Sequence, residues 1–148
     1  MHQPHRTLGL AATIAAMLAL GAPPAAHAGG MGATLEGPGR DGVTYTVHMF
    51  ACSSSEMTGV TGAAEGVVQG KRRTLPLTLV AAGAKGDYQF QRTWPRDGHW
   101  LVRLAFAGAH APAMVAELGR DGRVRDRQFL WDSDGRYECE TRLAAVVR

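Results

Sequence analysis

Apolar residues alternate with polar ones along several short stretches of the chain, and this period of two constrains the fold more than any other feature. From position 43 to position 49 the odd-numbered residues are Val, Tyr, Val and Met, and the even-numbered ones are Thr, Thr and His. The same alternation recurs at Leu75, Leu77 and Leu79, at Tyr88, Phe90 and Trp94, and at Trp100, Val102, Leu104 and Phe106. Successive side chains of a strand point to opposite faces of a sheet, so each stretch predicts a half-buried β-strand.

Further strands are expected over 113–118, 127–131 and 137–147, with another around 63–68, which brings the total to about eight. Asp-Gly pairs at 41/42, 97/98, 121/122 and 134/135 lie between these stretches or within them. Asp and Gly accept the backbone angles of tight hairpin turns. The segments Gly39-Arg40-Asp41-Gly42, Pro95-Arg96-Asp97-Gly98 and Gly119-Arg120-Asp121-Gly122 resemble one another, but their flanking strands do not match. We interpret them as recurring turns and not as an internal duplication.

The number of short strands and the lack of a long helical period define the expected fold class. Pro76 indicates an edge strand, because proline cannot donate to a hydrogen-bond ladder. Short strands with turn signals every ten or so residues predict an all-β protein, a single immunoglobulin-like antiparallel β-sandwich of about seven to eight strands. We assign this sandwich to residues 41–148 and expect a flexible N-terminal segment over 29–40.

The first 28 residues have the composition of a secretory signal peptide. Arg6 stands among polar residues, an apolar run follows over roughly 8–22, and Ala26-His27-Ala28 ends the segment as a small-residue cleavage site. The apolar run is shorter than the roughly 20 residues that cross a membrane as a helix. We therefore expect cleavage after Ala28, a periplasmic or secreted protein, and no membrane span after cleavage. Retention of the segment as an anchor is the alternative.

The size and charge of the mature chain limit its partners. Cleavage leaves 120 residues, enough for one domain with its own hydrophobic core. Arg6 is the only charged residue of the leader, so 15 basic and 13 acidic residues remain. Apart from Lys71-Arg72-Arg73 the basic residues are scattered, and this distribution does not favour nucleic-acid binding. The expected partner is an unidentified protein or small ligand of the cell envelope.

One segment resembles a known group of domains. The residues concerned are Gly86, Tyr88, Trp94, Pro95, Gly98, Trp100 and Val102 in GDYQFQRTWPRDGHWLV. They resemble the G-x-Y, W-P-x-x-G-x-W-x-V core of small extracytoplasmic immunoglobulin-like modules, of which the YtkA-like and FixH-like groups are examples. The resemblance implies a non-catalytic periplasmic accessory module, associated in some cases with metal handling or with the assembly of membrane enzymes.

The two cysteines, Cys52 and Cys139, are an even number in a chain expected to be exported, and they predict a disulfide. Cys52 follows the strand over 43–49, and Cys139 shares the apolar parity of the last expected strand, so both can point inward. The bond would close a loop of nearly ninety residues. On the chain-entropy model such a loop stabilises the fold by roughly 4 kcal/mol.

The segment HMFACSSSEM, which begins at His48, contains the imidazole and sulfur ligands that suit copper. On an extended strand His48 and Met49 point to opposite faces, so this pair cannot chelate one ion unless the strand breaks. The candidate site is His48 together with His110, Met49, Met57 or Met114. A periplasmic copper-binding or carrier protein that uses these residues is therefore the alternative function. Without it, no cofactor is expected.

The remaining candidate site consists of aromatic residues. Trp94 and Trp100 flank a turn, where they are either core residues or an exposed platform for a carbohydrate or peptide. The chain has no G-x-S-x-G, H-E-x-x-H or phosphate-loop motif, and we interpret Ser53 to Ser55 as a polar turn. The sequence thus predicts no catalytic residues, and the expected function is an exported non-catalytic binding or accessory module.

Overall fold

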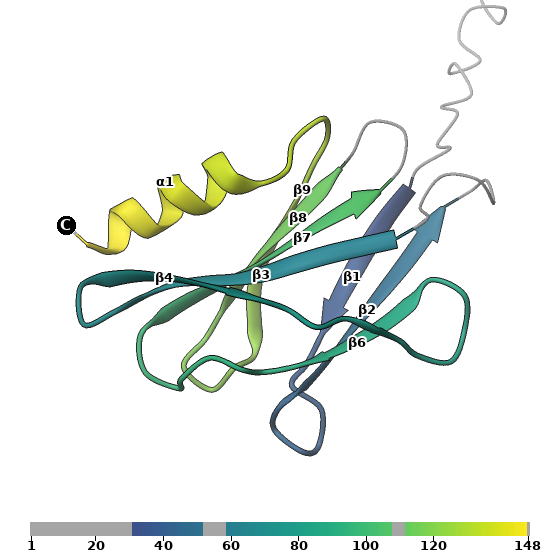
Figure 1. Ribbon diagram of the computed structural model, residues 1–148, viewed down its shortest axis with the longest axis horizontal. Helices are drawn as coiled ribbons and strands as arrows, with labels where there is room; N and C mark the ends of the chain where they lie inside the picture. Colours follow the sequence, from purple (N-terminus) through teal and green to yellow (C-terminus); the bar gives the residue numbers. More distant parts are fainter. Residues whose placement is uncertain (1–30, 52–58, 108–111, 148) are drawn as a thin grey trace, which may run out of the picture.

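The computed structural model describes residues 31–51, 59–107 and 112–147. Two antiparallel sheets pack face to face, and one helix lies against the outside of the larger sheet (Figure 1). The four-stranded sheet has the order β1 (Met31–Glu36), β2 (Thr44–Ala51), β6 (Asp87–Gln91) and β5 (Val80–Ala81). The five-stranded sheet has the order β4 (Lys71–Pro76), β3 (Gly59–Val68), β7 (His99–Ala107), β8 (Ala113–Leu118) and β9 (Val124–Leu130).

This strand order is that of an immunoglobulin-like sandwich. With β1, β2, β6 and β5 taken as strands A, B, E and D, β3, β7 and β8 form the opposing C-F-G sheet. β4 adds a strand beside β3, and β9 adds one beside β8. The predicted all-β sandwich is confirmed, and β4 with its Pro76 lies at a sheet edge as expected.

The inward faces of the two sheets form one core. Tyr45, Val47 and Met49 of β2 and the even-numbered residues of β7 point into it, as their alternation predicts. Tyr45 stacks on Phe90 with the ring centroids 5.2 Å apart, and the Trp94 ring lies 5.8 Å from that of Tyr45. The hydroxyl of Tyr45 also donates a hydrogen bond to the carbonyl of Gly122 at 2.7 Å. This bond fastens the four-stranded sheet to the turn between β8 and β9.

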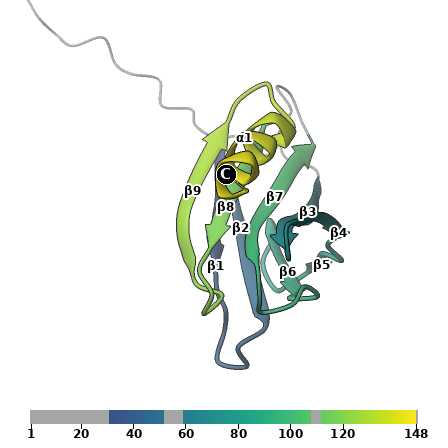
Figure 2. The ribbon, with the colours of Figure 1, turned by 90° about the vertical axis from the view of Figure 1, so that its left-hand side faces the viewer.

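Helix α1 (Arg136–Val146) covers the outer face of the five-stranded sheet (Figure 2). Cys139 and Leu143, one turn apart on the helix, pack in a second buried cluster with Val67, Leu101 and Val115. β8 is therefore buried on both faces, which explains why residues 113–118 are an almost continuous apolar run.

Arg142 fixes the helix to β9. Its guanidinium donates to Glu138 of the helix at 2.6 Å, to Asp126 at 2.7 Å and to Gln128 at 2.8 Å. The hydrogen bond to Glu138 raises the pKa of Arg142, and the hydrogen bond from Arg142 lowers the pKa of Asp126. The C-terminal part of α1 is thus held in a defined position beside β9.

Two local predictions are wrong. Residues 137–146 form a helix and not a strand: Cys139 and Leu143 pack against the outer face of the five-stranded sheet, whereas Tyr137, which would point the same way in a strand, is exposed. The segment 29–40 was expected to be flexible, but its residues 31–36 form β1, which pairs along its length with β2. In the described residues no helix is long and apolar enough to cross a membrane.

The two Gly-Arg-Asp-Gly segments form matching turns. In each, the amide of the second glycine donates to the carbonyl of the first, Gly42 to Gly39 at 2.9 Å and Gly122 to Gly119 at 2.8 Å. In each, the aspartate carboxylate accepts backbone hydrogen bonds within the turn, at Asp41 and at Asp121. The common sequence therefore has a common conformation, as predicted for recurring turns.

Candidate ligand-binding groove

His48 lies on the outward face of the four-stranded sheet, between two carboxylates. Its Nδ1 is 3.0 Å from Oδ1 of Asp87 on β6, and its Nε2 is 3.9 Å from Oε2 of Glu36 on β1. Met114 is only 1% exposed and belongs to the core between the sheets. These two predicted copper ligands therefore lie on opposite sides of the four-stranded sheet, and the structure does not bring them together.

The other predicted metal ligands do not join His48 either. Met49 packs against the core between the sheets, and Met57 and His110 lie outside the described residues. Within residues 31–51, 59–107 and 112–147, no group of three or more His, Cys, Asp or Glu side chains is arranged to hold a metal ion.

Cys139 lies on the side of α1 that faces the five-stranded sheet, where its side chain is buried. Burial raises the pKa of this thiol to about 12, and the nearby charge of Glu65 acts in the same direction. Cys52, its predicted partner, lies outside the described residues, so the disulfide stays a prediction. The strand on which Cys139 was expected to point inward does not exist, and the residue faces the outer side of the five-stranded sheet.

Trp94 and Trp100 are core residues, only 4% and 3% exposed. Their rings pack together with centroids 6.2 Å apart, and Trp100 Nε1 donates to the carbonyl of Asp97 at 2.9 Å. The structure contradicts an exposed aromatic platform at these residues, because neither ring offers a face to a ligand.

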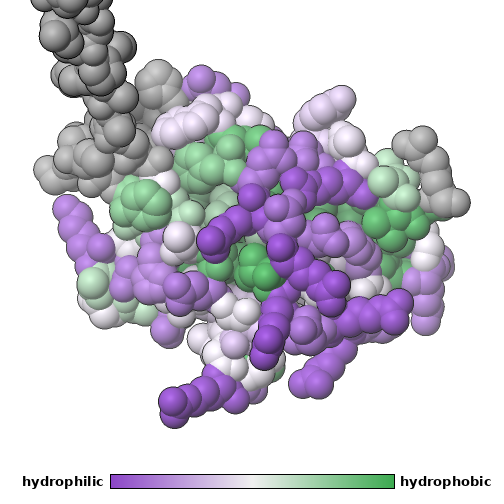
Figure 3. All heavy atoms as spheres, turned by 180° about the vertical axis from the view of Figure 1, so that it is seen from behind, coloured by the Kyte–Doolittle hydropathy of each residue, from purple (hydrophilic) through white to green (hydrophobic). Residues whose placement is uncertain are grey.

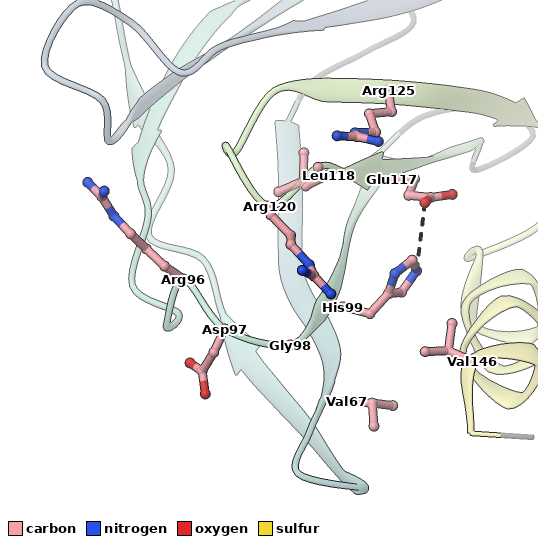
Figure 4. Close-up of a pocket in the computed structure, with 11 residues that line it drawn as sticks. Val67, Arg96, Asp97, Gly98, His99, Glu117, Leu118, Arg120, Arg125 and Val146 are labelled. Carbon is pink, nitrogen blue, oxygen red and sulfur yellow. Dashed lines mark ion pairs between the residues drawn. The ribbon is translucent and has the colours of Figure 1, made fainter.

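A groove of about 650 Å³ runs beside the C-terminal end of α1 (Figure 4). It lies on the outer face of the five-stranded sheet and is lined by the β6–β7 turn, the adjoining ends of β7 and β8, the β8–β9 turn and Arg125 of β9. Val67 of β3 and Val146 of α1 complete it. A volume of this size is in the range of small-molecule and peptide sites.

Arg120 and Arg125 supply the positive charge of the groove. Figure 4 shows the guanidinium of Arg120 beside His99 and that of Arg125 on the same side as Glu117, whereas Arg96 and Asp97 point away. Within the described part of the chain, neither Arg120 nor Arg125 forms a hydrogen bond or ion pair through its side chain. Their donors are therefore available to a ligand.

Glycines allow the backbone to place these groups. A Cβ atom on Gly119 would lie 2.3 Å from Nε of Arg125, so the guanidinium occupies space that a side chain would take. Gly98 has a φ of +90°, and a Cβ there would lie 2.6 Å from the carbonyl oxygen of Val67. The β6–β7 turn can thus approach β3 closely, which brings His99 and Val67 together at the groove.

The centre of the groove is polar and one side of it is apolar. His99 Nε2 and Glu117 Oε1 lie 3.9 Å apart on neighbouring strands. Val67 and Val146 line the side toward α1 (Figure 4). The side chains of Arg120, Arg125 and Glu117 together carry one net positive charge. The groove can therefore accept an anionic group together with an apolar group.

Hydrophilic side chains dominate much of the surface seen from behind the view of Figure 1. In Figure 3 they project across the middle and lower part of this face, and apolar surface shows between them. Residues 125–128 of β9 are all exposed. Of these, Asp126 is hydrogen-bonded to Arg142, whereas Arg125 is directed into the groove.

This groove was not predicted from the sequence. Its residues are separated in the chain, and the turns that carry Arg96 and Arg120 were interpreted only as turns. A signal was present nonetheless, because a sandwich places the β6–β7 and β8–β9 turns at the same end, and both turns contain an Arg-Asp-Gly segment.

Comparison with known proteins adds no relative: no family model, no curated protein and no solved structure matches the chain. The resemblance of residues 86–102 to YtkA-like and FixH-like modules therefore stays a prediction.

Proposed function

We propose that the protein is an exported, non-catalytic binding module that holds an acidic group of its ligand in the groove beside α1. Export rests on the composition of residues 1–28. Binding rests on one observation: Arg120 and Arg125, whose guanidinium groups have no partner among the described residues, line a groove that also contains His99. A guanidinium has five donors in a planar fork that matches a carboxylate or phosphate.

The surrounding contacts support recognition at this place. The ring of Trp100 and the hydrogen bonds of the β8–β9 turn fix the backbone on two sides of the groove. The ion pair of Arg142 with Asp126 and its hydrogen bond to Gln128 hold α1 on the third side. A site carried by fixed elements loses less entropy on binding than a flexible one, so even a small acidic ligand can bind there.

The test is an NMR titration of the ¹⁵N-labelled mature protein with sodium acetate, phosphate and sulfate against sodium chloride at constant ionic strength. We expect at least one anion to shift the amide signals of Gly119, Arg120 and Arg125 in a saturable way. The double variant Arg120→Ala/Arg125→Ala should lose this response. Arg40→Ala, which changes the same position of the matching β1–β2 turn, should keep it.

An absence of saturable shifts at these three amides with all three anions would contradict the proposed function. Equal responses of the double variant and of Arg40→Ala would also contradict it, because the effect would then not depend on the groove arginines.

A further inference from the structure

We infer that the groove recognises the carboxyl-terminal residue of a polypeptide whose last side chain is apolar. This inference rests on the proposed function and specifies its ligand. Three features of the groove support it. They are the net positive charge of its arginines and Glu117, the apolar surface beside α1, and the hydrogen-bond acceptor that Glu117 provides.

The charge of the groove fits a single negative charge. Arg120 and Arg125 contribute two positive charges, and Glu117 contributes one negative charge near His99. A carboxylate carries one negative charge, which the remaining positive charge of the groove balances. A phosphate dianion would bring a second negative charge close to Glu117, and like charges at short range repel.

The apolar side of the groove favours a ligand that carries an apolar group next to its anionic group. Val67 is buried and Val146 is exposed, and both line the side of the groove that faces α1 (Figure 4). An apolar side chain that covers them removes apolar surface from water, which favours binding. In a polypeptide terminus the last side chain stands one atom away from the carboxylate, so both contacts are made together.

Glu117 distinguishes a peptide from a simple aliphatic acid. Its carboxylate accepts hydrogen bonds and donates none, and the amide N–H of a terminal residue is a donor placed next to the carboxylate. A short aliphatic acid has no such donor, and it would leave much of the groove of about 650 Å³ unfilled. Capture of a terminal carboxylate is a known mode of peptide recognition.

The structure also suggests a variant that moves a charged group of the groove without removing it. In Gly119→Ala the new Cβ would displace the guanidinium of Arg125 and the carboxylate of Asp121, which would lie 2.3 Å and 2.5 Å from it. Gly39 occupies the same position in the matching turn, where a Cβ would meet its nearest atoms at 3.5 Å, an ordinary contact. Gly39→Ala is therefore the matched control for Gly119→Ala.

The experiment measures the affinity of the mature protein by NMR titration for four probes. The probes are the acetylated tetrapeptide Ala-Ala-Ala-Val with a free carboxylate, the same peptide with a C-terminal amide, isovalerate, and inorganic phosphate. We expect the free-acid peptide to bind most tightly. Amidation should weaken binding about tenfold or more, because it removes a charge-assisted hydrogen bond.

The variants complete the test. Arg120→Ala, Arg125→Ala and Gly119→Ala should each weaken binding of the free-acid peptide, whereas Arg40→Ala and Gly39→Ala should bind it as the wild type does. Thermal melting checks that each variant is folded. If Gly119→Ala melts much lower than the wild type, the two arginine variants decide the result, since their side chains have no partner in the described residues.

Three outcomes would overturn the inference and leave the proposed function standing: equal binding of amide and free acid, isovalerate binding as tightly as the peptide, or phosphate binding more tightly than the peptide. If no probe shifts the groove amides, both the inference and the proposed function fail.

Discussion

The guanidinium of Arg103 and the carboxylate of Glu65 lie 2.6 Å apart between β7 and β3, with each side chain only 13% exposed. Arg103 also donates to the carbonyl of Asp134 at 3.2 Å, in the loop before α1. This pair therefore links the outer face of the five-stranded sheet to the start of the helix that borders the groove.

Removal of one charge from this pair should destabilise the fold. Glu65→Gln leaves Arg103 buried without a charged partner, and we expect a loss of about 3 kcal/mol in the free energy of unfolding. The double variant Glu65→Leu/Arg103→Met should lose less, because it buries no unpaired charge. Urea denaturation measures both values.

The control for this prediction is Arg123→Ala, whose ion pair with Asp121 is exposed and 4.0 Å long. It should cost less than about 1 kcal/mol. An equal cost for Glu65→Gln and Arg123→Ala would show that the Glu65–Arg103 pair contributes no more than a surface pair.

Gly66 provides a test of core packing. A Cβ on Gly66 would lie 2.4 Å from the ring of Trp100, whereas a Cβ on Gly59 of the same strand would meet nothing within 4 Å. Gly66→Ala should therefore lower the free energy of unfolding by about 1–3 kcal/mol through overpacking, and Gly59→Ala should not lower it. Two variants of equal stability would indicate that the Trp100 ring moves freely, against the packing described above.

The Cys139 thiol should make the fold sensitive to alkaline pH. Its pKa is about 12 in the folded protein and ordinarily 9.0. Above pH 9 the thiol ionises in the unfolded chain but not in the folded one, so stability is complete below pH 9 and is lost as the pH rises toward 12. In a reducing buffer, the wild type should lose more free energy of unfolding between pH 8 and pH 11 than Cys139→Ala. Parallel pH profiles would contradict this.

Alkylation tests the burial of Cys139 and the predicted disulfide in one experiment. In a reducing buffer, the buried, protonated thiol should resist iodoacetamide at pH 8 in the folded protein and react once the chain unfolds. Peptide mass mapping measures the label at Cys139. Labelling in the folded state would contradict the burial, and a requirement for a reductant after unfolding would establish the disulfide predicted from Cys52 and Cys139.

The alternation of apolar residues was sufficient to predict the sandwich, because each strand of its core buries one of its two faces against the other sheet. Val47 on β2 and Val102 on β7 are both buried, as their parity required. The same pattern failed over 137–147, where Cys139 and Leu143 are four residues apart. A spacing of four satisfies both a strand and a helix, and only contact with the sheet decides between them.

β1 was missed for a related reason. Its sequence MGATLE is short, and among residues 32–36 the one large buried side chain is that of Leu35, so its own pattern is weak. It becomes a strand because β2 offers an edge with which it pairs. Such long-range pairing contributes nothing to a local pattern, and composition alone therefore favoured a flexible segment.

The groove could not be predicted from spacing because its groups meet only through the topology. His99 and Glu117 are outward-facing residues of neighbouring strands, and Arg120 reaches them from a turn. The topology separates the residues that were predicted to bind copper. His48 and Met114 have suitable chemistry, but the parity of their strands turns them to opposite sides of a sheet.

A crystal structure of the protein with the acetylated peptide Ala-Ala-Ala-Val would show whether the groove binds a terminal carboxylate. We expect this carboxylate within hydrogen-bond distance of the guanidinium groups of Arg120 and Arg125, with the last valine side chain against Val67 and Val146. A peptide bound elsewhere on the surface, or a groove without peptide at a saturating concentration, would contradict this expectation.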